Sequence, residues 1–368
     1  MRMFQVRVLW CVALVLAVCG FYADAQASPP NKQPGISTVA STVPANGDVN
    51  PYGIAVVPSS TGSLVQGNIL VSNFNDSANL QGTGTTIVQI SPSGTASLFA
   101  QINAGSLPGL CPGGVGLTTA LAVLRTGWVI VGSLPTTDGM SDTAQAGCLL
   151  VLDSNGNVAE TFYGSLINGP WDMAALDNGS TADLFVTNVL NGTVAAGGNV
   201  VHAGTVLRMG LTIASGSMPA LQSMTIIGSG FPERTDPAAL VIGPTGVALS
   251  PNGSTLYVAD SLSNRLAAIA NPVTRSTSAG IGTTITQGGA LNDPLGLTVS
   301  SGGNILTVNG NNGFIVETTS AGSQIAKRLI DSSGTPPGAG ALFGLVDVSG
   351  VGIYYVDDAT NTLNLFSF

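Results

Sequence analysis

The stretch Gly243-Pro244-Thr245-Gly246-Val247-Ala248-Leu249-Ser250-Pro251-Asn252-Gly253, followed by Leu256-Tyr257-Val258-Ala259-Asp260, decides the fold of this 368-residue chain. It reads as a short apolar strand that opens on a Pro-x-Gly turn, and then a second strand that ends on a small polar residue. The pattern occurs six times, with related copies that begin at Pro51, Thr118, Pro170, Pro294 and Leu342. Repetition of a strand unit at this spacing predicts an all-β, six-bladed β-propeller.

Each copy alternates apolar and polar residues between breaks of Gly, Asn or Ser, which predicts four antiparallel strands per blade. The expected blades span approximately residues 50–101, 118–163, 170–228, 244–287, 294–330 and 342–368. The sixth copy is one strand short. Residues 36–42 alternate in the same way and belong to no copy. We therefore expect them to supply the missing outer strand and to close the ring, which removes an open sheet edge.

Short polar residues end the second strand of every copy. Such side chains cap turns by bonding nearby backbone N–H groups, so this position favours a structural role over ligand binding. The residues are Asn73, Ser133, Asn188, Asp260, Asn309 and Asp357.

The first 27 residues predict a secretory signal peptide. Arg2 and Arg7 precede an apolar run over residues 8–18, and the small residues around Ala25 offer a cleavage site. This run is too short to span a bilayer, and no later stretch reaches the roughly 18 apolar residues of a membrane helix. We expect residues 28–368 to form one exported domain, secreted or periplasmic, without a transmembrane segment. A lipoprotein cleavage box ending at Cys19 is the alternative, and it would leave the protein lipid-anchored.

Charged residues make up only 8% of the chain, glycine occurs 49 times, and the formal net charge is -9. Phosphate recognition needs clustered Lys and Arg, so this composition excludes nucleic acid as a partner. We expect a monomer.

Two cysteines, Cys111 and Cys148, follow the predicted signal. An even pair in an oxidising compartment predicts a disulfide, with two buried free thiols as the alternative. Both cysteines belong to connections on one face of the predicted ring. On that face the connections of the first three blades are long, at residues 76–84, 134–147 and 190–204, and we expect them to form a raised loop wall.

Residues 258–266, Val-Ala-Asp-Ser-Leu-Ser-Asn-Arg-Leu, follow the fourth Pro-x-Gly turn and complete a motif. The motif resembles the NHL repeat and the gluconolactonase-like six-bladed propellers. The resemblance covers most of the chain after the signal, and it is strongest in the fourth copy and weakest in the second. It implies a propeller but no particular chemistry, because similar repeats occur in binding scaffolds, lyases, lactonases and receptors.

The resemblance also implies where a metal ion would bind. Gluconolactonase-like enzymes hold a divalent cation at the channel mouth with Glu, Asn and Asp side chains, two of which lie within the first-strand turns. The equivalent residues here are Tyr52, Thr119, Trp171, Thr245, Leu295 and Phe343. This set cannot form a carboxylate cage, so we expect no metal and no cofactor. Asp172, in place of the turn glycine of the third copy, adds one charge near the ring.

Four of these residues, Tyr52, Trp171, Leu295 and Phe343, are large and apolar. With Asp172, Thr119 and Thr245 as polar groups, the seven residues are a candidate ligand-binding set at the channel mouth. A hydrophobic plug that seals the channel is the alternative interpretation, and the sequence leaves both open.

Catalytic groups are scarce. The chain has one histidine, His202, three glutamates, and no nucleophile elbow or zinc ligand set, so we predict no catalytic residue. Asp138 and Asp142 offer two oxygens to Ca²⁺ but lack the full series of a calcium loop. We therefore expect a binding or scaffolding module for a small molecule, a glycan or a protein, acting through the loop-rich face of blades one to three. The alternative is a divergent metal-dependent lactonase or lyase that uses Asp172 with a loop-borne acid.

Overall fold

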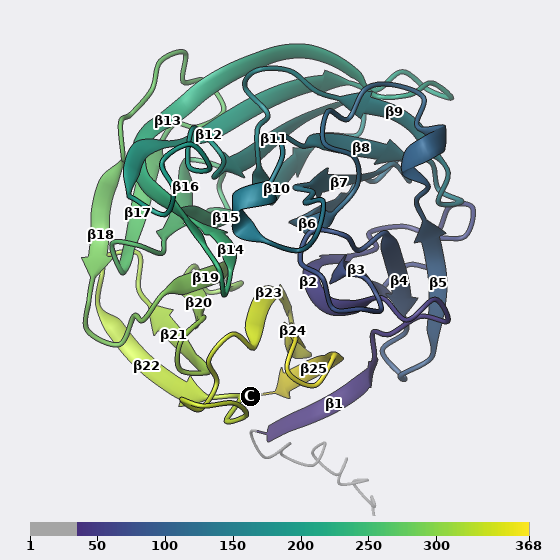
Figure 1. Ribbon diagram of the computed structural model, residues 1–368. Coiled ribbons are helices and arrows are strands. Elements are labelled where there is room, and N and C mark those ends of the chain that lie inside the picture. Colours follow the sequence, from purple (N-terminus) through teal and green to yellow (C-terminus); the bar gives the residue numbers. More distant parts are fainter. Residues whose placement is uncertain (1–34, 368) are drawn as a thin grey trace, which may run out of the picture.

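The protein is a ring of six β-sheets arranged radially about a central axis (Figure 1). The computed structural model describes residues 35–367, so the predicted signal peptide and Cys19 lie outside the described residues. In each blade four strands follow one another outward from the channel (Figure 1). The expected six-bladed propeller, closed by a strand from the N-terminal segment, is confirmed.

Blades one to three follow the order of the chain. Blade one contains β2 (Val49–Val56), β3 (Ile69–Asn75), β4 (Thr86–Ile90) and β5 (Ala96–Gln101). Blade two contains β6 (Leu117–Val123), β7 (Val129–Ser133), β8 (Cys148–Leu152) and β9 (Val158–Phe162). Blade three contains β10 (Pro170–Asp177), β11 (Thr181–Asn188), β12 (Val201–Thr212) and β13 (Ala220–Asp236), to which β14 (Leu240–Ile242) is added.

Blades four to six repeat the same plan. Blade four contains β15 (Pro244–Leu249), β16 (Thr255–Asp260), β17 (Arg265–Ala270) and β18 (Thr283–Gln287). Blade five contains β19 (Pro294–Val299), β20 (Ile305–Asn309), β21 (Phe314–Thr318) and β22 (Gln324–Leu329). Blade six contains β23 (Leu342–Val348), β24 (Gly352–Asp357), β25 (Thr362–Ser367) and β1 (Gly35–Ser41).

Two short 3-10 turns, η1 (Ala104–Ser106) and η2 (Ser141–Thr143), interrupt the strands. Over residues 35–367, no helix has the length and apolar character needed to span a membrane.

β1 closes the ring by antiparallel pairing with β25, from Gly35 opposite Ser367 to Ser41 opposite Thr362. Thr42 extends this contact, because its backbone N–H and its hydroxyl both donate to the carbonyl oxygen of Asn361, at 3.0 Å each. Strands from the two ends of the described chain thus share one sheet, as Figure 1 shows for β1 and β25.

The turn glycines of the first strands let neighbouring blades approach closely. A Cβ atom on Gly246 would meet the carbonyl oxygen of Leu295 in the next blade at 2.2 Å, and one on Gly296 would meet that of Phe343 at 1.9 Å. Real Cβ contacts never become so short, so only glycine fits. The recurring Pro-x-Gly turn therefore reflects the contact between blades.

The longest strands form an extended hairpin that the sequence does not predict. We expected the third blade to end near residue 228, whereas β13 has 17 residues, continues to Asp236 and pairs with β12 over most of its length. β13 then turns back through β14, which pairs with its last residues, from Arg234 opposite Ile242 to Asp236 opposite Leu240. The tip of this β13–β14 hairpin reaches the centre of the ring.

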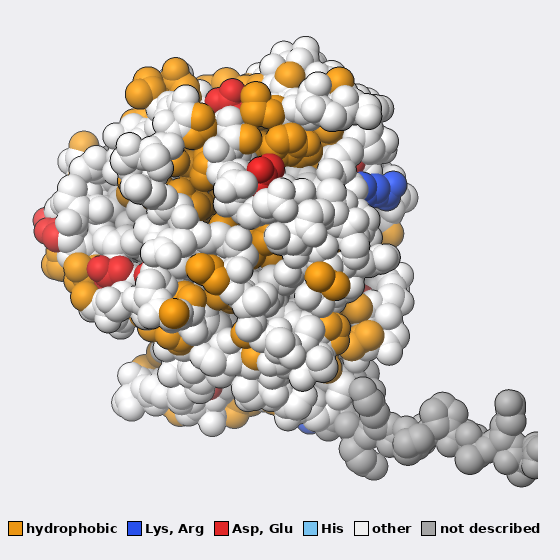
Figure 2. Space-filling view, turned by 90° about the vertical axis from the view of Figure 1, so that its right-hand side faces the viewer, with side chains coloured by type: hydrophobic (Ala, Val, Ile, Leu, Met, Phe, Trp, Pro, Cys, Tyr) orange, Lys and Arg blue, Asp and Glu red, His pale blue; other side chains and the backbone are white. Residues whose placement is uncertain are grey.

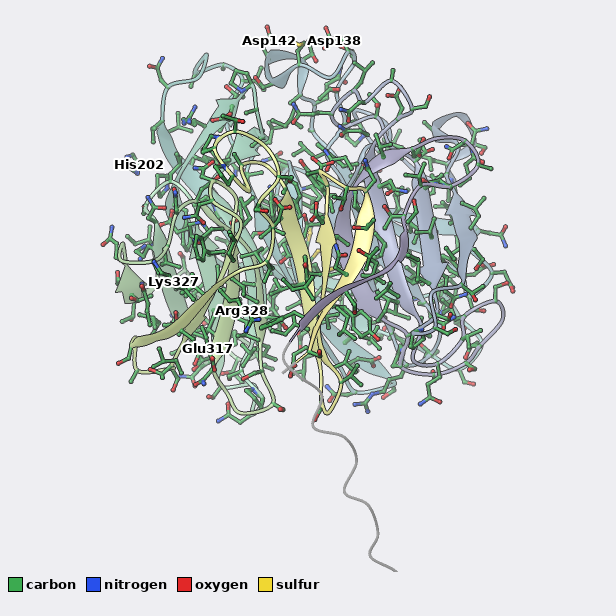
Figure 3. All side chains as sticks on the ribbon, turned by 90° about the horizontal axis from the view of Figure 1, so that it is seen from below. Asp138, Asp142, His202, Glu317, Lys327 and Arg328 are labelled. Atoms are coloured by element: carbon green, nitrogen blue, oxygen red, sulfur yellow. A yellow bond between two sulfur atoms is a disulfide. The ribbon has the colours of Figure 1, made fainter. Side chains whose placement is uncertain are left out.

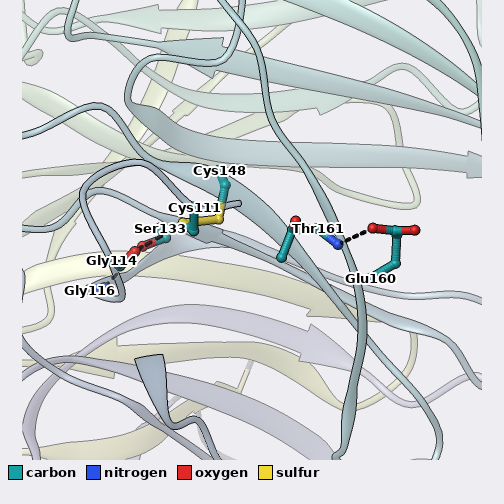
Figure 4. The surroundings of a disulfide bond; sticks show 7 residues. All are labelled: Cys111, Gly114, Gly116, Ser133, Cys148, Glu160 and Thr161. Atoms are coloured by element: carbon teal, nitrogen blue, oxygen red, sulfur yellow. Dashed lines mark hydrogen bonds between the residues drawn. A yellow bond between two sulfur atoms is a disulfide. The ribbon is translucent and has the colours of Figure 1, made fainter. Parts of the chain in front are cut away.

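The predicted disulfide between Cys111 and Cys148 is present (Figure 4). It joins the connection between blades one and two to the first residue of β8. Beside it, Ser133 accepts a hydrogen bond from the N–H of Gly116 and donates one to the carbonyl oxygen of Gly114, at 3.0 Å each. The disulfide and Ser133 together hold the 111–116 connection against blade two.

Candidate functional site

The large residues predicted at the channel mouth pack against one another. Tyr52, Trp171, Leu295 and Phe343 are each at most 5% exposed and belong to one apolar cluster. The Tyr52 ring lies between those of Phe74 and Phe343, with centroids 4.4 and 3.8 Å away. We call Tyr52, Trp171, Leu295 and Phe343 the channel plug.

The tip of the β13–β14 hairpin covers the channel plug. Leu240 and Val241 are each 1% exposed and lie against Tyr52 and Trp171. The gap that remains between them measures about 10 Å³, which is room for about one water molecule. At this end of the channel, the predicted binding residues therefore surround no space of ligand size.

The three polar residues of the predicted set are separated by the fold. Thr245 is fully buried, and its hydroxyl contacts the carbonyl oxygen of Pro294 at 2.9 Å and the hydroxyl of Ser261 at 2.8 Å. Asp172 lines a different space, the channel beyond the plug, and Thr119 lines both that channel and the small gap at the plug. Of the seven predicted residues, only Leu295 and Phe343 line a larger hollow on the loop face.

This hollow is a groove of about 540 Å³ between the β13–β14 hairpin and blades four to six. Its polar side consists of one guanidinium, several amides and three carboxylates, and its apolar side includes Ile242, Leu262, Leu295 and Phe343. The charged and amide residues are Arg234, Asp236, Asp293, Asp358, Asn264, Asn292 and Asn311.

The groove lies over blades four to six, whereas we expected the binding surface over blades one to three. Parts of the long connections of blades two and three instead pack inward. Leu134, Ala144 and Val189, from the connections that follow β7 and β11, are buried in the same cluster as the channel plug. These connections therefore fill part of the space above blades two and three, and the groove lies on the opposite side of the ring, over blades four to six.

Asp293 is held in the groove by its backbone. It has a φ of +56°, a left-handed conformation that costs free energy for a residue other than glycine, although Asp and Asn tolerate it best. Its N–H donates to the side-chain oxygen of Asn264 at 2.6 Å, and its carbonyl oxygen accepts from the N–H of Gly310 at 2.7 Å. Burial, together with the nearby Asp236 carboxylate, raises its pKa to about 6 despite the opposing charge of Arg234.

Asp358 is the second partly buried acid of the groove. Burial and the neighbouring Asp357 carboxylate raise its pKa to about 7. Its backbone N–H donates to the carbonyl oxygen of Ala341 at 2.8 Å, which fixes the turn after β24. Asp293 and Asp358 thus change charge within the range that proton transfer near neutral pH requires.

Arg234 forms an ion pair with Asp236, with 2.6 Å between a guanidinium nitrogen and a carboxylate oxygen. About a third of the Arg234 side chain remains exposed. The charges of Arg234 and Asp236 cancel each other. The carboxylates of Asp293 and Asp358 remain, so the groove is rich in hydrogen-bond acceptors.

Neither a known protein family nor a curated protein matches this sequence. Solved structures do match the fold. A gluconolactonase from Xanthomonas campestris aligns with a TM-score of 0.54 at 15% identity, over 90% of this chain and 88% of its own. The calcium-binding protein regucalcin from Agrobacterium tumefaciens aligns at 0.55 and 14% identity, over 89% and 93% of the two chains. Virginiamycin B lyase from Staphylococcus aureus aligns at 0.50 and 13%, over 91% and 100%.

This chain shares the gluconolactonase-like propeller fold. At such low identities, the similarity establishes the architecture alone. Of the three solved structures named, one is a lactonase, one is a calcium-binding protein and one is a lyase, so the fold does not select a function.

Within the described residues 35–367 of this propeller, no three His, Cys, Asp or Glu side chains lie close enough together to hold a metal ion. The carboxylate of Asp138 forms hydrogen bonds within its own loop. It accepts one from the hydroxyl of Thr143 at 2.6 Å and one from the N–H of Met140 at 3.1 Å. Asp138 and Asp142 lie at the edge of one face, and His202 lies at the outer rim, far from both (Figure 3).

The second-strand termini mostly cap turns, as predicted. Asn309, for example, donates to the carbonyl oxygen of Ala290 and accepts from the N–H of Asn292. Two positions differ. Neither the amide nitrogen nor the amide oxygen of Asn188 has a hydrogen-bond partner, and Asn73 only donates, to the carbonyl oxygen of Thr42 and the hydroxyl of Thr86.

The groove residues were missed because nothing in the sequence brings them together. Arg234 and Asp236 lie in a segment that we expected to be a connection, and Asp293 and Asp358 immediately follow or precede repeat motifs. One signal was available: acidic residues follow the end of β24 and precede Pro294, both on the loop face of the propeller.

Proposed function

We propose that this protein is an exported binding module that holds a small, hydroxyl-rich molecule in the groove over blades four to six. The observation that carries the proposal is the groove itself, whose volume of about 540 Å³ falls within the usual range for ligand sites. It combines an apolar side with a few fixed polar groups, which is the usual composition of such sites.

The chemistry of the lining supports this ligand class. Carboxylates accept hydrogen bonds, the guanidinium donates them, and the amides of Asn264 and Asn292 can do both. Hydroxyl groups also donate and accept, so a sugar-like molecule can satisfy all three kinds of group at once. Leu295 and Phe343 offer an apolar surface for its carbon skeleton.

The Cys111–Cys148 disulfide supports export, because disulfides persist in oxidising compartments. The charged N-terminal segment with its apolar run supports the same location.

The test is a thermal-shift screen of the full chain against mono- and disaccharides and sugar lactones, followed by titration calorimetry of the compounds that shift the melting temperature. We expect at least one compound to raise it by a few degrees, and the effect to disappear in Asp293→Asn and Asp358→Asn. Asp142→Asn, at an exposed position outside the groove, is the matched control. A full set of compounds without effect, or binding that survives both groove variants, would contradict the proposal.

A lactonase or lyase is the second candidate, favoured by the raised pKa of Asp293 and of Asp358. Either group can take up or release a proton near neutral pH. The same lactone panel separates the candidates, since turnover that Asp358→Asn abolishes would show an enzyme. Turnover that a chelator abolishes would additionally show a metal-dependent one.

A further inference from the structure

A second cavity lies on the propeller axis, on the other side of the channel plug. It has a volume of about 350 Å³ and is lined by the innermost strands of all six blades. Gly344 and Asp172, which line it, directly follow Phe343 and Trp171 in the sequence, so the cavity begins where the plug ends. It extends toward the face that bears the turns between first and second strands, where Ala175 is exposed.

Asp172 is the one charged side chain among the described residues that line this cavity. It is 8% exposed, and its two carboxylate oxygens accept hydrogen bonds from the N–H groups of Met173, at 2.8 Å, and Val247, at 2.9 Å. Each oxygen keeps a second lone pair. An anion in a confined apolar space attracts a cation strongly, because the local dielectric constant is low.

Thr119 lies at the boundary between the two spaces, since it lines both this cavity and the small gap at the channel plug. It is 4% exposed, and its hydroxyl has no hydrogen-bond partner. A buried hydroxyl without a partner is costly, and a bound group that donates to it removes this cost. Thr119 belongs to β6 of blade two and Asp172 to β10 of blade three, and these two strands pack against each other.

The rest of the cavity wall is mainly aliphatic. Its larger apolar side chains come from all six blades and are Ile54, Val56, Leu121, Val123, Met173, Val247, Leu249, Leu297, Leu345 and Val346. Such a wall solvates a hydrocarbon chain and gives no hydrogen bonds to a polar one.

We propose that this channel binds a primary alkylammonium ion, with its ammonium group between Asp172 and Thr119 and its alkyl chain along the aliphatic wall. The ammonium has three donors, which match the carboxylate and the hydroxyl. The negative charge of the protein favours the approach of such a cation. The site is separate from the groove of the proposed function, and neither proposal depends on the other.

The test is isothermal titration calorimetry of the full chain with n-hexylamine hydrochloride, and with 1-hexanol as a neutral ligand of the same shape. At pH 8 we expect one bound hexylammonium ion and at least about tenfold weaker binding of 1-hexanol, because hydrogen bonds to charged groups are the stronger ones. Asp172→Asn should weaken hexylamine binding at least about tenfold, and Thr119→Val by a few-fold, with little effect on 1-hexanol.

Lowering the pH gives an independent readout. Burial raises the pKa of Asp172 to about 7, while alkylamines stay protonated below about pH 10. Hexylamine affinity should therefore fall by up to about tenfold per unit below pH 7, since the carboxylate takes up a proton. β6, β7 and β15, which pack against β10, have no titratable side chain, and Asp177 and Asp183 lie at the opposite ends of β10 and β11.

Asp172 also bridges blades three and four through Val247, so Asp172→Asn can weaken the fold. Ala175→Phe is the second variant, because it narrows the exposed end of the channel without touching either polar group. We expect it to reduce hexylamine binding while the melting temperature stays unchanged.

Three results would overturn the proposal. They are no binding at millimolar hexylamine, equal affinity of wild type and a folded Asp172→Asn variant, and loss of binding in the groove variant Asp358→Asn instead. The first result would indicate that the channel holds water only, and the last would place the amine in the groove.

Discussion

Glycine at the first-strand turns is required by contact between blades. The position after Leu295 illustrates the point, since any Cβ on Gly296 overlaps the carbonyl oxygen of Phe343 in blade six. The backbone of neither blade can move away without separating the two sheets, because a well-packed interior resists expansion. In blade three Asp172 replaces this glycine, and its carboxylate reaches across to blade four and accepts from Val247.

Gly296→Ala should lower the free energy of unfolding by about 2 kcal/mol or more, because overpacking a close contact typically costs about 1–3 kcal/mol. Urea unfolding followed by tryptophan fluorescence measures this. Gly302→Ala is the matched control, since a Cβ at Gly302 meets only the Ser300 hydroxyl at 3.8 Å. Equal stability of the two variants would refute the close-contact explanation.

Trp171→Ala should lower the free energy of unfolding by about 3–5 kcal/mol, because it removes a buried indole from the channel plug and leaves a cavity. Thermal and urea unfolding measure the loss. Trp128, a partly buried tryptophan outside the plug, provides the comparison, and Trp128→Ala should cost less. A Trp171→Ala protein of unchanged stability that has lost a ligand would instead favour a pocket at the channel mouth.

At the scale of elements, differences in the length of hairpins and connections decide which parts of the loop face are covered and which stay open. The β13–β14 hairpin reaches over the axis and seals one end of the channel, while the short connections of blades four to six leave the groove beside it. Figure 2 shows the side of the ring beside β5 and β9, on which few Lys or Arg side chains are visible.

β1 is the element on which closure depends. A chain that begins at residue 43 should unfold at a temperature at least about 10 °C lower and should aggregate, because β25 would become an exposed edge strand with unpaired backbone groups. Differential scanning calorimetry and light scattering measure the two effects, with a chain that begins at residue 35 as the control. If both chains behave alike, the pairing of β1 with β25 contributes little.

At the scale of the whole molecule, an acidic protein keeps several carboxyl groups out of water. Burial is the main cause that raises the pKa of Asp172, Glu233 and Asp358 to about 7, and that of Asp293 and Asp357 to about 6. In the unfolded chain these groups have a pKa near 4. The folded protein therefore binds protons more tightly than the unfolded chain over about pH 4 to 7.

Stability should consequently decrease as the pH rises through this range and level off above about pH 8. We expect the melting temperature to be at least about 5 °C higher at pH 5 than at pH 8, as measured by calorimetry at constant ionic strength. Glu233→Gln, at a fully buried position, should reduce this difference, and Asp142→Asn, at an exposed one, should not. A melting temperature that increases from pH 5 to pH 8 would contradict the raised pKa values of these carboxyl groups.

The sequence by itself determined the number of blades, the closing strand and the disulfide. These follow from local patterns, namely the Pro-x-Gly turns, the period-two alternation of residues 36–42 and an even pair of cysteines. It also identified the residues at the channel mouth, but it left open whether they enclose a pocket or a plug.

Only the tertiary structure decided what covers that mouth and where the hollows lie. Leu240 and Val241 reach the axis through the β13–β14 hairpin, which no repeat predicts. Arg234 comes from β13, Asp293 and Asp358 come from two different connections, and all three line one groove. Such contacts depend on the path of long connections through space, and hydrophobic periodicity carries no information about that path.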